Sequence, residues 1–150
     1  FDGIAELTDD SLQKFYAAPK NAYAHVGVYF SLPYIELGDA YELKFGIEVE
    51  TNLYCQFFLY DRATKKAEVI PADFLPKLKP YFGDALTPNG NTHPDWAHLP
   101  LIEGRDRVNF RDRELMDDEI LSLFDDEKRA AAIERAMPTI EMMLKKINWE

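Results

Sequence analysis

Two histidines and an aspartate lie close together in the segment His-Pro-Asp-Trp-Ala-His, so that His93, Asp95 and His98 offer two imidazoles and a carboxylate. These are ligand types that zinc and iron use in proteins. The intervening proline breaks regular helical spacing, and the proline-rich residues 87–100 are typical of a long loop. We therefore favour a solvated loop with Trp96 anchored in the core over a metal site, and we predict no bound metal.

The sequence Glu42-Leu-Lys44, with Asp39 just before it, matches part of a metal-dependent nuclease site. In such a site two carboxylates hold Mg²⁺ while the lysine polarises the attacking water. Glu42 and Lys44 also fall on the polar face of an alternating strand, which explains them without catalysis. The chain contains no phosphate-binding loop, nucleophile elbow or dinucleotide-binding motif. We therefore predict a protein that is not an enzyme and has no cofactor, with a small metal-dependent hydrolase or nuclease as the alternative.

Arginines recur at odd positions over a short stretch that we call the arginine stripe. It comprises Arg105, Arg107, Arg111 and Arg113. In an extended segment residues two apart share a face, and the guanidinium fork suits carboxylate or phosphate recognition. The alternative is structural, with residues 105–110 forming a strand whose arginines pair with Glu42, Glu48 and Glu50 across the sheet. The structural interpretation is the favoured one.

An acidic segment follows the arginine stripe directly and holds no lysine or arginine between residues 114 and 127. Its acids are Glu114, Asp117, Asp118, Glu119, Asp125, Asp126 and Glu127. Capping of helix N-termini explains part of this clustering, because carboxylates are favourable there. The remainder predicts a partner-binding surface. We assign to it Asp117, Asp118, Asp125, Asp126 and Glu127, together with Arg105, Arg107 and Arg111.

The overall composition limits the classes of partner. The chain has 150 residues with 27 acids and 17 bases, and its net charge of -10 argues against direct nucleic-acid binding and favours a basic protein partner. No apolar run approaches the roughly 20 residues needed to cross a bilayer, so no membrane partner is expected. The single cysteine, Cys55, favours a reducing compartment and hence a cytoplasmic location. We expect a single domain over residues 1–150, which could be excised from a larger chain.

Alternating apolar residues predict an antiparallel sheet of four to five strands. The clearest runs cover residues 24–32, 41–50 and 53–61, joined by short turns. Residues 65–70 are the candidate fourth strand and 105–110 the fifth. In the third run Cys55 points inward with Phe57 and Leu59, where an apolar environment would leave its thiol inert.

Helical periodicity flanks the strands, so the fold class is α+β with helices packed on one face of the sheet. Residues 8–18 form a short helix, whereas prolines restrict 72–82 to short helical pieces. A further helix over 112–124, capped by Asp112, directs Met116, Ile120, Leu123 and Phe124 inward. The last helix starts at Asp125 or Asp126, is kinked at Pro138, and is the main cover of the sheet. Its apolar stripe comprises Ile133, Met137, Ile140, Leu144 and Ile147.

The order of these elements resembles a known module. It is carried by residues 24–30, 41–49 and 56–60, by the Asp95-Trp96 pair, and by the acidic helical stretch 121–126. This layout resembles the C-terminal accessory module of some bacterial PD-(D/E)xK nuclease-superfamily proteins. No complete nuclease site can be matched, so no catalytic residue is transferred. Size, acidity and layout are also similar to bacterial immunity proteins and phage-encoded inhibitors. The resemblance implies a non-enzymatic binding module of a conflict system, with a basic toxin or nuclease as its partner.

Overall fold

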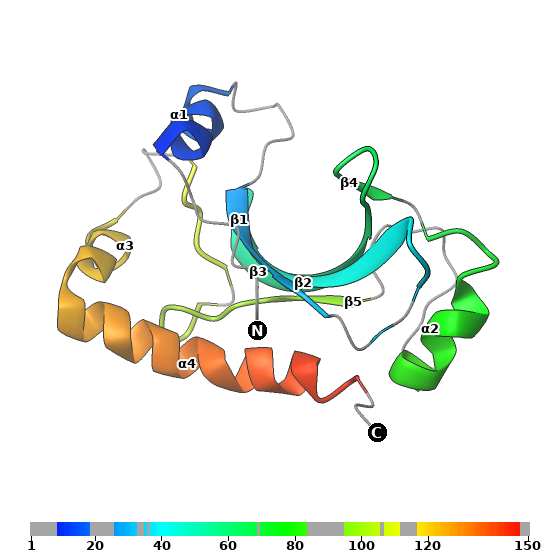
Figure 1. The fold of residues 1–150 in the computed structure, drawn as a ribbon. Coiled ribbons are helices and arrows are strands. Elements are labelled where there is room, and N and C mark those ends of the chain that lie inside the picture. Colours follow the sequence, from blue (N-terminus) through cyan, green and yellow to red (C-terminus); the bar gives the residue numbers. More distant parts are fainter. Residues whose placement is uncertain are drawn as a thin grey trace.

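The computed structural model describes residues 9–18, 26–32, 35, 37–68, 70–83, 95–105, 107–111 and 117–147. It confirms an α+β fold built on an antiparallel sheet (Figure 1). The elements in chain order are α1 (Asp9–Ala17), β1 (Val26–Ser31), β2 (Tyr41–Val49), β3 (Leu53–Asp61), β4 (Lys66–Glu68), α2 (Leu75–Phe82), β5 (Asp95–His98), α3 (Asp118–Leu121), η3 (Ser122–Phe124) and α4 (Asp126–Leu144). No helix in these ranges is long and apolar enough to span a membrane.

The sheet is organised around β3. Its strand order is β1-β2-β3-β4, and β5 shares the second edge of β3 with β4. β5 pairs with residues 54–57 and β4 with residues 59–61, so β3 has neighbours along both edges. Figure 1 shows the sheet strongly curved, with α4 and β5 beneath its convex side. This central position explains why the third run is apolar on both faces.

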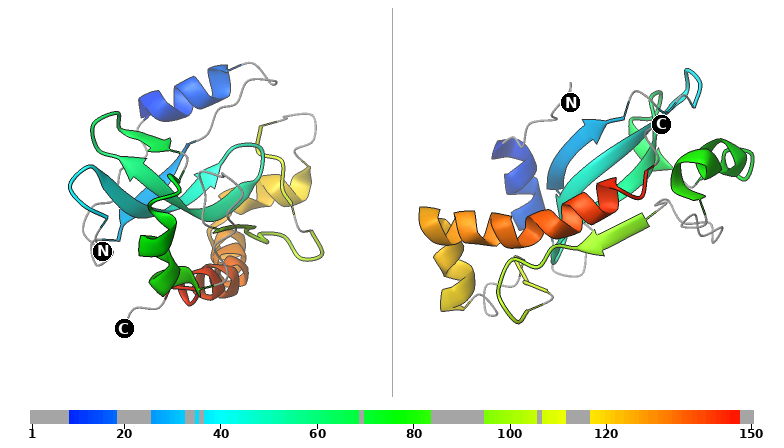
Figure 2. Two further views of the ribbon diagram at one scale, coloured as in Figure 1. Left: turned by 90° about the vertical axis from the view of Figure 1, so that its right-hand side faces the viewer. Right: turned by 90° about the horizontal axis from the view of Figure 1, so that it is seen from below.

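One side of the sheet, which we call the core face, carries the alternating apolar residues predicted from the sequence. Leu43, Phe57 and Leu59 on this face are fully buried. Helix α4 covers it with Met143 and α2 covers it with Leu78, both also fully buried. Figure 2 shows α4 crossing beneath the sheet beside β5. The predicted burial of Cys55 among these residues is confirmed.

The opposite side of the sheet, which we call the polar face, is held together by side-chain pairs rather than by helices of the described part. Glu48 is buried there and accepts a hydrogen bond from the Gln56 amide, as buried polar groups require. Tyr29 and Phe58 pack edge to face across the sheet, with ring centroids 5.5 Å apart. Gly46, which lies opposite Tyr29, leaves the space that these rings fill.

The fifth strand is not where the sequence predicted it. Of the described residues in this range, 105 and 107–110, only Arg105 takes part in a β-bridge, with Ile102, and the fifth strand is β5, inside the predicted loop 87–100. Trp96 is 51% exposed instead of anchored in the core. The physical reason is that the backbone N–H and C=O groups along the second edge of β3 require hydrogen-bond partners. The four residues of β5 contain no proline, so they can pair with that edge.

The predictions for the helices are confirmed in part, since Ile120 is buried and Leu123 packs against the core as expected. Helix α2 is continuous over Leu75–Phe82 and not divided into short pieces as predicted. Pro76 sits in its first turn, where no donor is lost, and the helix continues through Pro80. Asp125 caps α4 as expected, and α4 continues through Pro138. The predicted cap Asp112 and the inward Met116 lie outside the described residues. Phe124, predicted to be buried, is 82% exposed.

The predicted stripe of the last helix is confirmed in its C-terminal half, where Ile147 is buried and Ile140 and Leu144 pack against the core, but not in its N-terminal half. The buried residues of α4 are Ala132, Ala136 and Met143, whereas Ile133 is 54% exposed and Met137 is 40% exposed. Small side chains let a helix approach its neighbour closely, since the distance between packed elements depends on the residues at the contact. In the N-terminal half of α4, the alanines Ala132 and Ala136 therefore face the core in place of Ile133 and Met137.

Candidate functional site

The arginine stripe is not a continuous cross-strand ladder. The Arg105 guanidinium lies 2.6 Å from the Asp117 carboxylate and 2.9 Å from that of Glu119. The favoured prediction, pairing with Glu42, Glu48 and Glu50, is therefore wrong for Arg105. The reason is topological, because β1 and β3 occupy the two edges of β2 and leave no place for residues 105–110 beside it.

The remaining arginines occupy separate surroundings. Arg107 is exposed, and the Arg111 guanidinium lies 5.5 Å from the centroid of the Phe15 ring on α1. Arg113 lies outside the described residues. The stripe thus divides between an ion pair with the acidic segment, a solvent-exposed cation and a cation–π contact.

Three of the predicted partner-binding acids form helix caps or an ion pair within the chain. Asp117 accepts a hydrogen bond from the Ile120 backbone N–H at 3.1 Å and so caps α3. Asp125 caps α4 by accepting from the backbone N–H groups of Glu127 and Lys128. Asp126 forms an ion pair with Arg129 one turn further along. These contacts account for the N-terminal clustering that helix electrostatics predicts.

The pKa of the Asp117 carboxyl tests this arrangement. Its hydrogen bond from Arg105 is the main cause that lowers the pKa of the carboxyl below 3.8, followed by the bond from Ile120 N–H. Because the folded-state pKa is lowered, the stabilisation is present above pH 3.8 and is lost as the pH falls through the folded-state value. We expect Arg105→Gln to raise the pKa of Asp117, as followed by its carboxyl carbon in NMR. An unchanged pKa in that variant would show that Arg105 does not hold Asp117 in solution.

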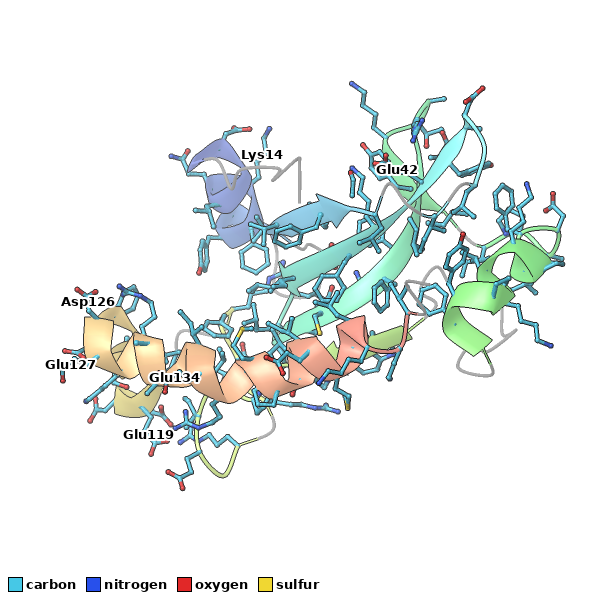
Figure 3. The ribbon with its side chains drawn as sticks, turned by 60° about the horizontal axis from the view of Figure 1, so that its bottom comes forward. Lys14, Glu42, Glu119, Asp126, Glu127 and Glu134 are labelled. Atoms are coloured by element: carbon cyan, nitrogen blue, oxygen red, sulfur yellow. The ribbon has the colours of Figure 1, made fainter. Side chains whose placement is uncertain are left out.

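The other acids of the segment are open to solvent. Asp118 and Glu127 are exposed, and neither carboxylate has an ion pair or side-chain hydrogen bond with another described residue. Figure 3 shows Glu119, Asp126, Glu127 and Glu134 at the α3–α4 end of the molecule. Exposed apolar side chains accompany them, with Leu121 at 47% and Phe124 at 82%. We call this combination, residues 117–127, the acidic surface.

A separate pocket of about 440 Å³ lies beside the start of β2. Asp39 and Glu42 both line it, together with Arg62, which the sequence pattern did not identify. The Lys44 ammonium lies 2.8 Å from one Glu42 oxygen, and Arg62 lies 3.4 Å from the other. The structure thus places Asp39 and Glu42 on one pocket and pairs Glu42 with Lys44, but the Glu42 carboxylate already has two cations beside it.

The histidine-containing segment is only partly described. His93 lies outside the described residues, while Asp95 begins β5 and His98 ends it. The His98 ring packs edge-on to Trp96, with centroids 5.0 Å apart. Among the described residues, no group of three or more histidine, cysteine, aspartate or glutamate side chains is placed to hold a metal ion.

Comparison of the chain with protein-family models, with curated proteins and with solved structures finds no significant match. The resemblance to a nuclease accessory module or to immunity proteins therefore stays a prediction.

Proposed function

We propose that this protein is a non-enzymatic binding module that recognises a basic protein through the acidic surface. The observation that carries the proposal is the exposure of Asp118 and Glu127, without compensating cations among the described residues, next to the exposed rings and chains of Phe124 and Leu121. Carboxylates surrounding exposed apolar groups are the arrangement expected of a surface that a partner covers.

The two kinds of side chain have different roles in such an interface. The carboxylates speed the encounter with a basic surface and exclude acidic proteins. Phe124, once covered, supplies apolar area that drives complex formation, since a few buried anchors provide most of the binding energy. The partner is a basic toxin or nuclease, and the module acts as its inhibitor or as the recognition part of a larger nuclease.

The test uses a variant that removes charge without removing a helix cap. Asp118→Asn together with Glu127→Gln leaves the capping carboxylates of Asp117 and Asp125 in place. We expect affinity capture from the source-cell lysate to retain a basic protein on the wild type and to lose most of it on this double variant. The retained amount should also fall as salt is raised, because exposed charges are screened.

The matched control removes the same charge from the opposite end of the molecule. Asp39 and Asp73 are exposed near the start of β2 and before α2, far from α3 in Figure 1. Asp39→Asn with Asp73→Asn should leave the captured amount unchanged. Equal loss in both double variants would show that net charge alone matters, and capture that is insensitive to both variants and to salt would contradict the proposal.

The pocket at Glu42 supports a second candidate, the metal-dependent hydrolase. Its support is the shared lining by Asp39 and Glu42 and the proximity of Lys44. A metal ion there would have to compete with Lys44 and Arg62 for the Glu42 oxygens. This competition is why we rank the binding function first.

A further inference from the structure

Helix α4 presents an apolar stripe that the fold leaves partly uncovered. Ile133, Met137, Ile140 and Leu144 follow one another at alternating spacings of four, three and four residues. This spacing is that of the a and d positions of a coiled coil, which line one side of a helix. Ile133 and Met137 are 54% and 40% exposed, while Ile140 and Leu144 are half-buried against the core. The stripe is therefore exposed to solvent in its N-terminal half and packed against the core in its C-terminal half.

A row of carboxylates borders this stripe. Glu127, Glu134 and Glu141 are spaced seven residues apart, so they lie along one line of the helix, two turns from one to the next. All are exposed, and none forms an ion pair with another residue of the described ranges. Each of the last two directly follows a stripe residue, Ile133 or Ile140. In coiled-coil terms the row occupies the flanking positions that select a partner by charge.

We propose that this stripe is the docking site for an amphipathic basic helix of the partner protein. The proposal deepens the proposed function, on which it rests, by naming the partner's element. The apolar side of that helix covers Ile133 and Met137, and its lysines or arginines face Glu127, Glu134 and Glu141. Helix-on-helix recognition of this kind uses anchors at the same heptad spacing on both partners.

Charge complementarity favours this occupant over a second copy of the chain packed antiparallel. Two α4 helices packed antiparallel through the stripe would place one carboxylate row against the other. Like charges at such flanking positions are destabilising, and each chain already has a net charge of -10. A basic helix brings the opposite charge to the same row, so its electrostatic interaction with Glu127, Glu134 and Glu141 is attractive.

The probe is a fluorescent synthetic helical peptide with leucine at its a and d positions and lysine at the flanking positions, titrated with the full chain. A peptide with glutamate in place of each lysine is the charge control. We expect the lysine peptide to bind and Met137→Glu or Ile133→Glu to weaken binding about tenfold or more, since each removes an apolar anchor. Glu134→Gln with Glu141→Gln should weaken binding and flatten its salt dependence.

The matched control is Met142→Glu. Met142 is 50% exposed on the same helix, about 140° around its axis from Met137, so the substitution adds the same charge on another side. Its binding should equal that of the wild type. Equal weakening by Met142→Glu and Met137→Glu, or no binding of the lysine peptide to the wild type, would overturn the proposal. So would sedimentation that shows a dimer abolished by Met137→Glu, because the occupant would then be a second copy.

Failure of this inference can be distinguished from failure of the proposed function. If Met137→Glu leaves the partner captured from lysate while Asp118→Asn with Glu127→Gln loses it, the acidic surface binds the partner and the stripe does not. If neither set of substitutions alters capture, both proposals are wrong.

Discussion

Replacing Phe57 with alanine is expected to destabilise the protein by about 3–5 kcal/mol, the cost typical of a buried phenylalanine. Phe57 lies at the centre of β3 and is fully buried. Its ring centroid is 5.1 Å from that of Phe45 on β2 and 5.1 Å from that of Phe82 on α2. The substitution thus opens a cavity between sheet and helix, where neither neighbour can relax without losing its own contacts.

The measurement is the midpoint and slope of urea denaturation followed by circular dichroism. Phe124→Ala is the matched control, because it makes the same chemical change at a side chain that is 82% exposed. Its effect should stay within about 0.5 kcal/mol. Comparable destabilisation by both variants would mean that Phe57 is not a centre of the core.

Replacing Gly27 with alanine is expected to cost about 1–3 kcal/mol, as overpacking does. A β-carbon at this position would lie 2.5 Å from the Ile47 carbonyl oxygen on the neighbouring strand. It would also lie 2.7 Å from Cγ of the buried Glu48. Because the nearest obstacle is backbone, β1 must move away from β2, which weakens the ladder between them.

Gly46→Ala is the comparison that separates close approach from a general effect of removing glycine. A β-carbon there would meet side chains rather than backbone, at 3.0 Å from the Tyr29 ring and 3.2 Å from the Phe58 ring. These rings can turn, and alanine is favoured over glycine inside a strand by about 0.5–1 kcal/mol. We expect a clearly smaller loss of stability than for Gly27→Ala, measured by the same urea denaturation. The reverse order would contradict the strand register.

Much of the sheet could be predicted because its signal is local. Leu43 and Phe45 on β2, and Phe57 and Leu59 on β3, alternate with residues of the other face, and period-two alternation fixes which side of a strand is buried. The fourth strand also lay where a turn and a short alternating run predicted it. By contrast, β5 could not be predicted, because its partner is the edge of β3 and not any neighbour in sequence.

The candidate site was predicted in part. The cap at Asp125 is one of the two positions predicted for the last helix and is present in the structure, whereas the cap of α3 at Asp117 was not predicted. The partner of Arg105 could not be inferred, since a guanidinium pairs with whichever carboxylate the chain brings near it. The exposure of Ile133 and Met137 could not be predicted from the sequence either. The sequence does show that the carboxylates of the row that starts at Glu127 are seven residues apart.

The sequence by itself determined the fold class, the two faces of the central strands, the start of the last helix and the acidic character of the segment after the arginines. These properties depend on residues within a few positions of one another, where periodicity and capping operate. Only the tertiary structure decided that Ala132 and Ala136 face the core, that Trp96 lies on an exposed strand, and that Arg105 joins the acidic surface. Those outcomes depend on how closely distant elements approach, which no local pattern encodes.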